Sequence, residues 1–166
     1  MPEVNRSNQP RVLFVCLGNI CRSPTAHGVF QHIVEQRGLS AAITVDSCGT
    51  GQWHVGEPPD GRATAEAAKR GYDLSELRAR QLCATDYDFF DYILAMDHSN
   101  LTEIQQQCPA DYPGQLRLFL SYASHSEVLE VPDPYYGGDQ GFSEVLDLVE
   151  QASEGLLDAV CREWSL

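Results

Sequence analysis

The stretch VCLGNICRSP, from Val15 to Pro24, lies between two segments of different periodicity. The run RVLFV (11–15) is continuously apolar after its first residue, which is typical of a buried strand in a parallel sheet. The segment that follows (25–37) repeats its apolar residues at helical spacing. The glycine and the asparagine inside the stretch tolerate the backbone conformations that a tight loop needs. The stretch therefore predicts a strand, a loop and a helix in immediate succession.

A loop of this kind can bind an anion. Where a loop enters a helix, free backbone N–H groups converge, and the helix dipole favours negative charge at the same place. We expect Ser23 to cap this helix and Pro24 to occupy its first position. Arg22 adds a planar group that can bind two phosphate oxygens at once. The sequence therefore predicts a phosphate-binding loop after the first strand.

Strands and helices alternate along the rest of the chain. The expected strands are 11–15, 41–47, 91–97 and 116–120, and the expected helices are 25–37, 60–71, 99–107 and 143–164. This order predicts an α/β fold, a doubly wound sheet of four parallel strands with helices on both faces. Cys16, Ser47 and Asp97 fall at the carboxyl ends of strands, where such sheets bind ligands. We expect residues 1–10 to be a flexible N-terminus and residues 11–166 to form one domain.

The 166 residues carry a net charge of −13. A strongly acidic chain is a poor ligand for nucleic acids and for anionic membranes, so any attraction for an anion must be local. No apolar run approaches the roughly 20 residues of a membrane span, and the polar N-terminus predicts no signal peptide. The six cysteines follow no disulfide framework, which favours a reducing compartment. We therefore expect a cytoplasmic protein with no nucleic-acid or membrane partner, and we expect a monomer.

Cys16 follows the first strand, next to the expected helix N-terminus and to Arg22. Such surroundings favour the thiolate, which is the nucleophilic form of cysteine. Two other interpretations remain open, namely a small apolar side chain in the core or a metal ligand. Because no Cys or His pair lies nearby at metal-ligand spacing, we expect no metal.

The motif CLGNICRSP, between a strand and a helix, resembles the signature loop of low-molecular-weight protein tyrosine phosphatases. The segments DSCGTGQWHVGEPPDGRA, RARQL, FDYILAMDHSN and VPDPYYGG follow in the order and spacing of that family. The resemblance extends from Val12 to about Val160. It implies a cysteine-dependent enzyme that hydrolyses phosphotyrosine in protein substrates through a phosphocysteine intermediate, without cofactor or metal.

The resemblance also implies roles for the loop residues. Cys16 attacks phosphorus, while Arg22 and the backbone N–H groups of the loop hold the phosphate oxygens. Ser23 donates a hydrogen bond to the Cys16 sulfur and makes it a better leaving group in the second step. The backbone donors are those of Leu17, Gly18, Asn19, Ile20, Cys21 and Arg22.

Support for the loop is expected from outside it. The resemblance implies that Asn19 holds the loop in shape, partly through Ser47, and that Asp97 supports the loop from the third strand. Many members of the family carry a histidine just before RARQ that braces the loop asparagine, and here Leu77 stands in its place. Leucine cannot form a hydrogen bond, so the brace is absent or comes from another group.

Asp133, in VPDPYYGG, is the expected general acid and base. Tyrosine leaves badly as a phenolate because its pKa is about 10, so its oxygen needs a proton. Asp133 would supply that proton and then activate water; the alternative is an Asp-Pro turn with no catalytic role. Trp53, Tyr135 and Tyr136 are expected to wall a pocket deep enough for a phenyl ring, unless they are ordinary surface aromatics. The resemblance also implies that Tyr135 and Tyr136 can themselves be phosphorylated.

The other cysteines and the histidines receive lesser roles. Cys21 is either a redox partner of Cys16, as the resemblance implies, or a small apolar side chain. His54 lies closest to the motifs but is not assigned to the site. The rest are expected to be structural cysteines and surface histidines: Cys48, Cys83, Cys108, Cys161, His27, His32, His98 and His125.

Three other functions remain open. An arsenate reductase shares this fold and loop but needs a downstream cysteine pair; Cys83 has no local partner, because position 90 is Phe and Cys108 is too distant. A protein arginine phosphatase resembles the chain but typically has threonine where Ile20 stands. A phosphopeptide-binding module without activity would keep the loop, and only the missing histidine favours it.

Overall fold

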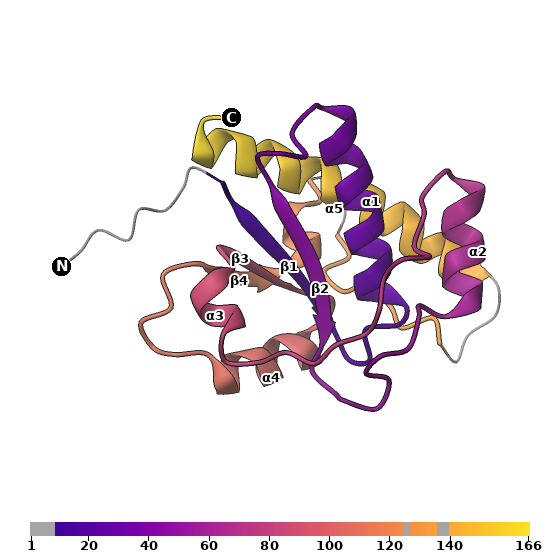
Figure 1. Cartoon of the computed structure of the whole chain (residues 1–166), viewed down its shortest axis with the longest axis horizontal. Helices are drawn as coiled ribbons and strands as arrows, with labels where there is room; N and C mark the ends of the chain where they lie inside the picture. Colours follow the sequence, from indigo (N-terminus) through magenta and orange to yellow (C-terminus); the bar gives the residue numbers. More distant parts are fainter. Residues whose placement is uncertain (1–8, 125–126, 136–139) are drawn as a thin grey trace.

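The computed structural model describes residues 9–124, 127–135 and 140–166 (Figure 1). Most of the predicted flexible N-terminus, together with His125 and Tyr136, lies outside these residues. No helix in the described part of the chain is both long and apolar enough to span a bilayer. In chain order the elements are β1 (Arg11–Cys16), α1 (Arg22–Gln36), β2 (Thr44–Gly49), α2 (Gly61–Lys69), α3 (Asp86–Phe89), β3 (Tyr92–Ala95), α4 (His98–Gln107), β4 (Gln115–Leu118), the 3-10 helix η1 (Phe119–Tyr122) and α5 (Gln140–Trp164).

The four strands form one parallel sheet in the order β2-β1-β3-β4. The chain passes from β1 outward to β2 and then returns past β1 to β3, so the direction of winding reverses beside β1. In open α/β sheets ligands bind at such a reversal, beyond the carboxyl ends of the strands. Cys16 of β1 pairs there with Gly49 of β2. The predicted parallel α/β fold is confirmed, and it places the loop after β1 at the ligand-binding edge.

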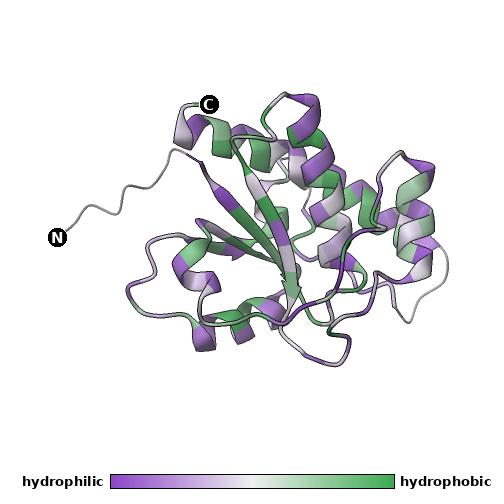
Figure 2. Ribbon diagram, in the orientation of Figure 1, coloured by the Kyte–Doolittle hydropathy of each residue, from purple (hydrophilic) through white to green (hydrophobic). Residues whose placement is uncertain are grey.

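Helices cover both faces of the sheet, with α1 and α5 on one side and α3 and α4 on the other (Figure 1). Alternate residues of β1 face opposite sides: Phe14 joins the core under α1 and α5, and Leu13 joins the core under α3 and α4. Both are fully buried, which explains why the run is apolar without interruption. Phe14 makes edge-to-face contacts with Phe30 and Phe119, whose ring centroids lie 5.6 and 4.9 Å away. Figure 2 shows the same distribution, with apolar residues along the central strands and mixed polarity on the helices.

Several element bounds differ from the predicted ones. β2 begins at Thr44 rather than at 41, because the N–H groups of Ala42 and Ile43 both donate to the Leu39 carbonyl in a turn. The strand predicted to reach 120 ends at Leu118 and continues as η1. The helix α3 is not among the predicted elements, since a single turn is too short to show a period.

The start of α1 corrects the predicted cap. The helix begins at Arg22 with Cys21 as its N-cap, and Cys21 makes no side-chain capping bond. Ser23 and Pro24 are therefore the second and third helical residues, and the prediction that Ser23 caps the helix is wrong. α2 begins within one residue of its predicted start, with Asp60 as the N-cap, whose carboxylate accepts a hydrogen bond of 2.8 Å from the Arg62 N–H.

Candidate active site

The loop between β1 and α1 surrounds the sulfur of Cys16. Cys16 Sγ lies 3.0 Å from Ser23 Oγ, and the Asn19 N–H donates to the same sulfur at 3.3 Å. The two residues that follow β2 support the loop, since Thr50 and Gly51 donate N–H bonds of 2.9 Å to the carbonyls of Cys16 and Leu17. The sulfur therefore sits in a fixed, hydrogen-bonded position at the carboxyl end of the central strand.

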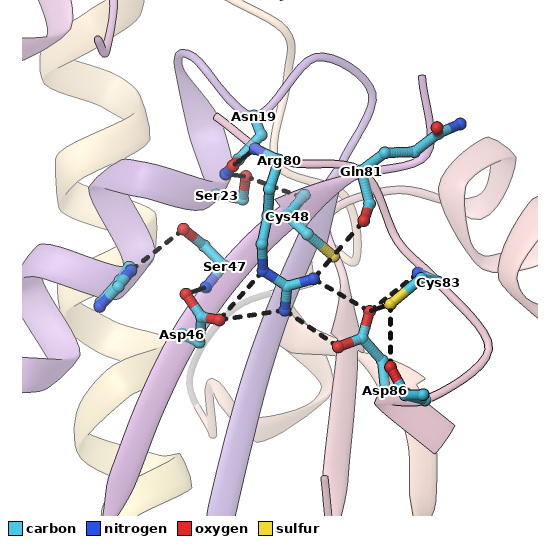
Figure 3. Close-up of polar contacts among 11 residues, drawn as sticks. Asn19, Ser23, Asp46, Ser47, Cys48, Arg80, Gln81, Cys83 and Asp86 are labelled. Carbon is cyan, nitrogen blue, oxygen red and sulfur yellow. Dashed lines mark hydrogen bonds and ion pairs between the residues drawn. The ribbon is translucent and has the colours of Figure 1, made fainter. Parts of the chain in front are cut away.

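Asn19 holds the loop in a conformation that L-amino acids rarely adopt, with φ of +56°. Its Nδ2 donates to Ser23 Oγ at 2.7 Å, and its Oδ1 accepts from the backbone N–H of Arg80 at 3.1 Å (Figure 3). Among the described residues the predicted contact with Ser47 is not found, because Ser47 Oγ instead lies 3.0 Å from His27 Nδ1. The prediction that Asn19 is held through Ser47 is therefore wrong.

The brace that a histidine at position 77 would give comes from the main chain of Arg80. Leu77 itself packs against the apolar core under α1 and α5. The Arg80 guanidinium lies between two carboxylates (Figure 3): it donates to Asp46 Oδ2 at 3.1 Å and to both oxygens of Asp86 at 3.1 and 3.0 Å. The Arg80 carbonyl accepts the Gly49 N–H at 2.9 Å. These bonds fix the Arg80 N–H where it meets Asn19.

Arg22, the first residue of α1, is buried with only 3% of its surface exposed. Its Nη1 donates to Asp97 Oδ2 at 2.6 Å and to the Val131 carbonyl at 3.0 Å. Its Nη2 lies 3.9 Å from Asp133 Oδ2. Burial opposes the charge, but the negative charge of Cys16 and the hydrogen bond that Arg22 donates to Asp97 outweigh it and raise the pKa of Arg22. The guanidinium is thus held charged and in place beside Cys16.

Two carboxylates from separate parts of the chain lie beside this guanidinium, Asp97 at Nη1 and Asp133 near Nη2. Asp97 is the N-cap of α4 and accepts the Asn100 N–H at 2.7 Å, so its carboxylate cannot swing away from Arg22. Asp133 lies in the loop before α5 and accepts the Tyr135 N–H at 3.0 Å. That bond is the local turn of an Asp-Pro sequence, and the same carboxylate faces the pocket, so the turn and the catalytic interpretation are compatible.

A pocket of about 320 Å³ opens above the Cys16 sulfur. The structure brings most predicted site residues into its lining, which includes Cys16, Leu17, Gly18, Ile20, Cys21, Arg22, Trp53, Asp133 and Tyr135. Asn19 of the loop and Ser23 of α1 are buried and do not line the pocket, and Ser47 and Asp97 also lie outside the lining. Trp53 is 71% exposed and Tyr135 38%, so two aromatic rings border the opening.

His54 is a pocket residue that the sequence analysis leaves out. Its ring lies against the loop, since a Cβ on Gly18 would come within 3.0 Å of His54 Cδ2. Its Nδ1 is 2.7 Å from Glu57 Oε2, and a carboxylate can only accept, so Nδ1 carries a proton. The one signal in the sequence is its position beside Trp53, which the resemblance already places in the pocket wall.

The remaining cysteines and histidines fall in varied surroundings. Burial, followed by the charge of Asp60, raises the pKa of the Cys21 thiol to about 12, and Cys21 packs with apolar neighbours such as Ile20 and Phe142. Cys21 is thus a protonated thiol at neutral pH. Cys48 is buried and Cys83 is exposed. The expectation of surface histidines is met by His98, whereas His27 and His32 are half-buried.

Among the described residues, no three His, Cys, Asp or Glu side chains lie close enough together to hold a metal ion. The positive charge of the site comes from Arg22, and the Asn19 N–H is a further donor beside the Cys16 sulfur. These groups suit an anion with several oxygens, which is the chemistry of a phosphate.

The family described as low molecular weight phosphotyrosine protein phosphatase matches residues 11–166. A low molecular weight phosphotyrosine protein phosphatase of Schizosaccharomyces pombe is 46% identical over 151 residues, which cover 90% of this chain and 96% of the relative. A low molecular weight protein-tyrosine-phosphatase of Streptomyces coelicolor is 46% identical over 153 residues, which cover 90% and 93%. The crystal structure of a protein tyrosine phosphatase from Entamoeba histolytica, with Hepes in its active site, superposes with a TM-score of 0.90 at 37% identity and covers 95% of this chain and 100% of that one.

Proposed function

Because the chain belongs to the low molecular weight phosphotyrosine protein phosphatase family, we propose that it hydrolyses phosphotyrosine with Cys16 as nucleophile, Arg22 as phosphate ligand and Asp133 as general acid and base. The observation that carries the proposal is the convergence of these three side chains on one pocket at the end of β1. A sulfur nucleophile, a fixed cation and a carboxylate are the groups that a phosphoryl transfer to cysteine requires.

The first step transfers the phosphoryl group to sulfur. The Cys16 thiolate attacks phosphorus, so the S–P bond forms while the bond from phosphorus to the tyrosine oxygen breaks. Arg22 and the loop N–H groups hold the equatorial oxygens as charge spreads over them. Asp133 gives its proton to the leaving oxygen, which departs as neutral tyrosine.

The second step returns the enzyme to its starting state. Asp133, now a carboxylate, takes a proton from water, and the water oxygen attacks phosphorus as the S–P bond breaks. Inorganic phosphate leaves and Cys16 departs as a thiolate. The neighbouring donors support this charge, because Ser23 Oγ lies 3.0 Å and the Asn19 nitrogen 3.3 Å from the sulfur.

The pocket walls support a preference for an aromatic phosphate ester. Trp53, His54 and Tyr135 rise around the opening, with the sulfur at its base. A phenyl ring carries its phosphate far enough from the peptide backbone to reach that base, whereas a serine side chain is shorter. We therefore propose a phosphotyrosine-containing protein as substrate.

Further parts of the proposal concern the protein as a whole. Residues 11–166 act as one phosphatase domain, which the family match over the same residues supports. The net charge of −13 supports a protein that binds neither nucleic acid nor anionic membranes. We also propose a monomer in the cytoplasm, where six cysteines without a disulfide framework stay reduced.

The test is hydrolysis of matched phosphotyrosine, phosphoserine and phosphoarginine peptides, with a chelator and a thiol present. We expect cleavage of phosphotyrosine alone, no turnover by Cys16→Ser, and about 10²- to 10⁴-fold slower turnover by Asp133→Asn. Cys161→Ser and Asp158→Asn, on α5 outside the pocket, are the matched controls.

Each alternative has its own outcome when arsenate reduction and peptide binding are measured beside hydrolysis. A wild type that prefers phosphoarginine would be an arginine phosphatase, and one that reduces arsenate with thiol would be a reductase. A wild type that binds phosphotyrosine peptide but never cleaves it would be a binding module. Turnover retained by Cys16→Ser would contradict the phosphocysteine intermediate.

A further inference from the structure

Asp133 lies in a loop, so side-chain contacts decide where its carboxylate sits. Upstream of it, Val131 is anchored to the sheet, because its N–H donates to the Met96 carbonyl at 2.8 Å and its own carbonyl accepts from Arg22. On the downstream side, the Tyr135 N–H donates to Asp133 Oδ1 at 3.0 Å. The position of Asp133 therefore depends on whatever holds Tyr135.

Arg62, near the start of α2, holds Tyr135. Its Nη2 donates to the Tyr135 carbonyl at 3.1 Å. Its guanidinium lies over the Tyr135 ring at 5.6 Å and over the Phe142 ring at 4.8 Å from the centroids. Phe142, in the first turn of α5, is only 3% exposed, so it offers Arg62 a fixed surface. The cation thus contacts the backbone and the ring of Tyr135 and an anchored ring beneath.

Arg62 is itself tied to the phosphate-binding loop through Asp60. Its Nε and Nη2 donate to the two oxygens of Asp60 at 3.1 and 3.0 Å, a bidentate pair. The Asp60 N–H donates to the Ile20 carbonyl at 2.8 Å. Contacts therefore run without a break from Ile20 through Asp60 and Arg62 to Tyr135, and from Tyr135 to Asp133.

We propose that Arg62 is a positioning residue, which sets the place of Asp133 relative to the phosphate-binding loop by holding Tyr135. The proposal rests on the proposed role of Asp133 as general acid. Arginine is required because its planar guanidinium binds both oxygens of Asp60, donates to a carbonyl and stacks on rings at the same time. The ammonium of lysine cannot make these contacts together. Arg62 does not line the pocket.

Loss of a residue that acts through the general acid should lower kcat/KM more for a substrate with a poor leaving group than for one with a good leaving group. Protonation of the leaving oxygen matters for tyrosine, whose phenol has a pKa of about 10, and matters little for p-nitrophenol, which leaves readily as an anion. The constant kcat/KM reports only the steps up to phosphoryl transfer. We expect Arg62→Ala to lower kcat/KM for a phosphotyrosine peptide about ten- to a hundredfold, and for p-nitrophenyl phosphate less than about threefold.

Further variants distinguish a misplaced Asp133 from a disrupted fold or a weakened phosphate site. Arg62→Gln and Arg62→Lys should show the same split between the two substrates, and inhibition by inorganic phosphate should be unchanged in all three. Arg117→Ala is the matched control, since Arg117 also stacks on a tyrosine, with 4.5 Å to the Tyr122 ring, but lies away from the pocket. In an Asp133→Asn background, adding Arg62→Ala should lower kcat/KM no further.

Two results would overturn the proposal. Equal loss on both substrates, or weaker inhibition by phosphate, in folded Arg62→Gln and Arg62→Lys would mean that Arg62 acts on the phosphate-binding loop instead. If Asp133→Asn lost kcat/KM equally on the phosphotyrosine peptide and on p-nitrophenyl phosphate, Asp133 would not be the general acid, and the proposal about Arg62 would have no basis. The second result is distinguishable from the first because it appears with Arg62 intact.

Discussion

The hydroxyl of Ser23 has three polar neighbours and a single proton. Ser23 Oγ lies 2.7 Å from Asn19 Nδ2, 3.0 Å from Cys16 Sγ and 3.3 Å from the Cys48 carbonyl. Because the Arg80 N–H donates to one atom of the Asn19 amide, that atom is the oxygen, and the amide nitrogen must face Ser23. Asn19 therefore donates to Ser23 and directs the Ser23 proton toward sulfur or toward the carbonyl. A thiolate is the stronger acceptor of the two.

Ser23→Ala should therefore slow the step in which sulfur leaves. A hydrogen bond to a charged group contributes about 1.5–3 kcal/mol, which corresponds to a loss of roughly 10- to 150-fold in kcat. Because the loss falls on hydrolysis of the phosphocysteine, the covalent intermediate should accumulate. Rapid-quench measurement with p-nitrophenyl phosphate should show a burst of one equivalent of nitrophenol per site.

The control for this variant is Ser121→Ala, which removes a hydroxyl that donates to the Leu118 carbonyl outside the pocket. It should turn over like the wild type and show no larger burst. A Ser23→Ala enzyme with normal kcat and no accumulated intermediate would mean that the Ser23 proton stays on the Cys48 carbonyl.

At the scale of the elements, the end of β2 sets the shape of the loop after β1. Gly49 pairs with Cys16 and faces the loop so closely that a Cβ there would lie 2.6 Å from the Leu17 carbonyl oxygen and 3.1 Å from the Asn19 nitrogen. Both are backbone atoms, so no side-chain rotation can relieve the contact. The phosphate-binding loop can hold its shape only while position 49 has no side chain.

Gly49→Ala should keep the fold and weaken phosphate binding. Forcing a methyl group into a packed site costs about 1–3 kcal/mol, and here the loop has to move to accept it. We expect the inhibition constant for inorganic phosphate to rise about ten- to a hundredfold, with kcat/KM lowered similarly. Gly61→Ala is the matched control, because no atom lies within 4 Å of a Cβ at that position. Normal phosphate binding by Gly49→Ala would show that the loop adapts.

Some secondary-structure elements can be predicted from the sequence and others cannot. The unit of β1, loop and α1 is predictable because its signals are local: an apolar run, a loop of permissive residues and a helical period. The prediction that Ser23 caps α1 is wrong because the Ser23 hydroxyl bonds to Cys16 and Asn19 rather than to the end of the helix. α3 and η1 are not predicted because a single helical turn is too short to show a periodic pattern of apolar residues.

In the site, the residues that the sequence does not identify are joined by long-range contacts. The brace on Asn19 comes from Arg80, which is distant in sequence and acts through its main chain, where side-chain chemistry gives no clue. Arg62 meets Tyr135 only because α2 and the loop before α5 are neighbours in space. The motif residues are predictable since a resemblance fixes them one by one, whereas these supporting contacts need the tertiary structure.

For the whole molecule, 24 acidic residues against 11 basic ones give a net charge of −13. The arginines pair mainly between elements, as Arg37 does with Glu154 and Asp158, and Arg70 with Asp147 and Glu150. These ion pairs join α1 and α2 to α5 on the surface, where each contributes little. Phosphate binding is therefore a short-range property of the loop, set against an unfavourable overall charge.

The stability of the whole molecule should depend on pH through His27. This histidine projects from α1 to β2, where its Nδ1 lies 3.0 Å from Ser47 Oγ. Burial lowers its pKa below the ordinary value of 6.5; the charge of Asp46 opposes this shift and that of Arg80 adds to it. As pH falls below about 6.5, the unfolded chain therefore takes up a proton at this residue before the folded protein does. The free energy of unfolding should decrease from pH 6.5 toward the lower pKa of the folded state.

Urea unfolding at pH 7.5, 6.5, 5.8 and 5.0 measures this loss directly, with His27→Gln as the informative variant. Glutamine keeps a polar group beside Ser47 but does not titrate, so the variant should be less stable than the wild type at pH 7.5 and should lose less stability by pH 5.0. His98→Gln, on the exposed start of α4, controls for the removal of any histidine. Parallel curves for the wild type and His27→Gln would mean that the buried imidazole accepts its proton without cost, and that other groups produce the acid sensitivity.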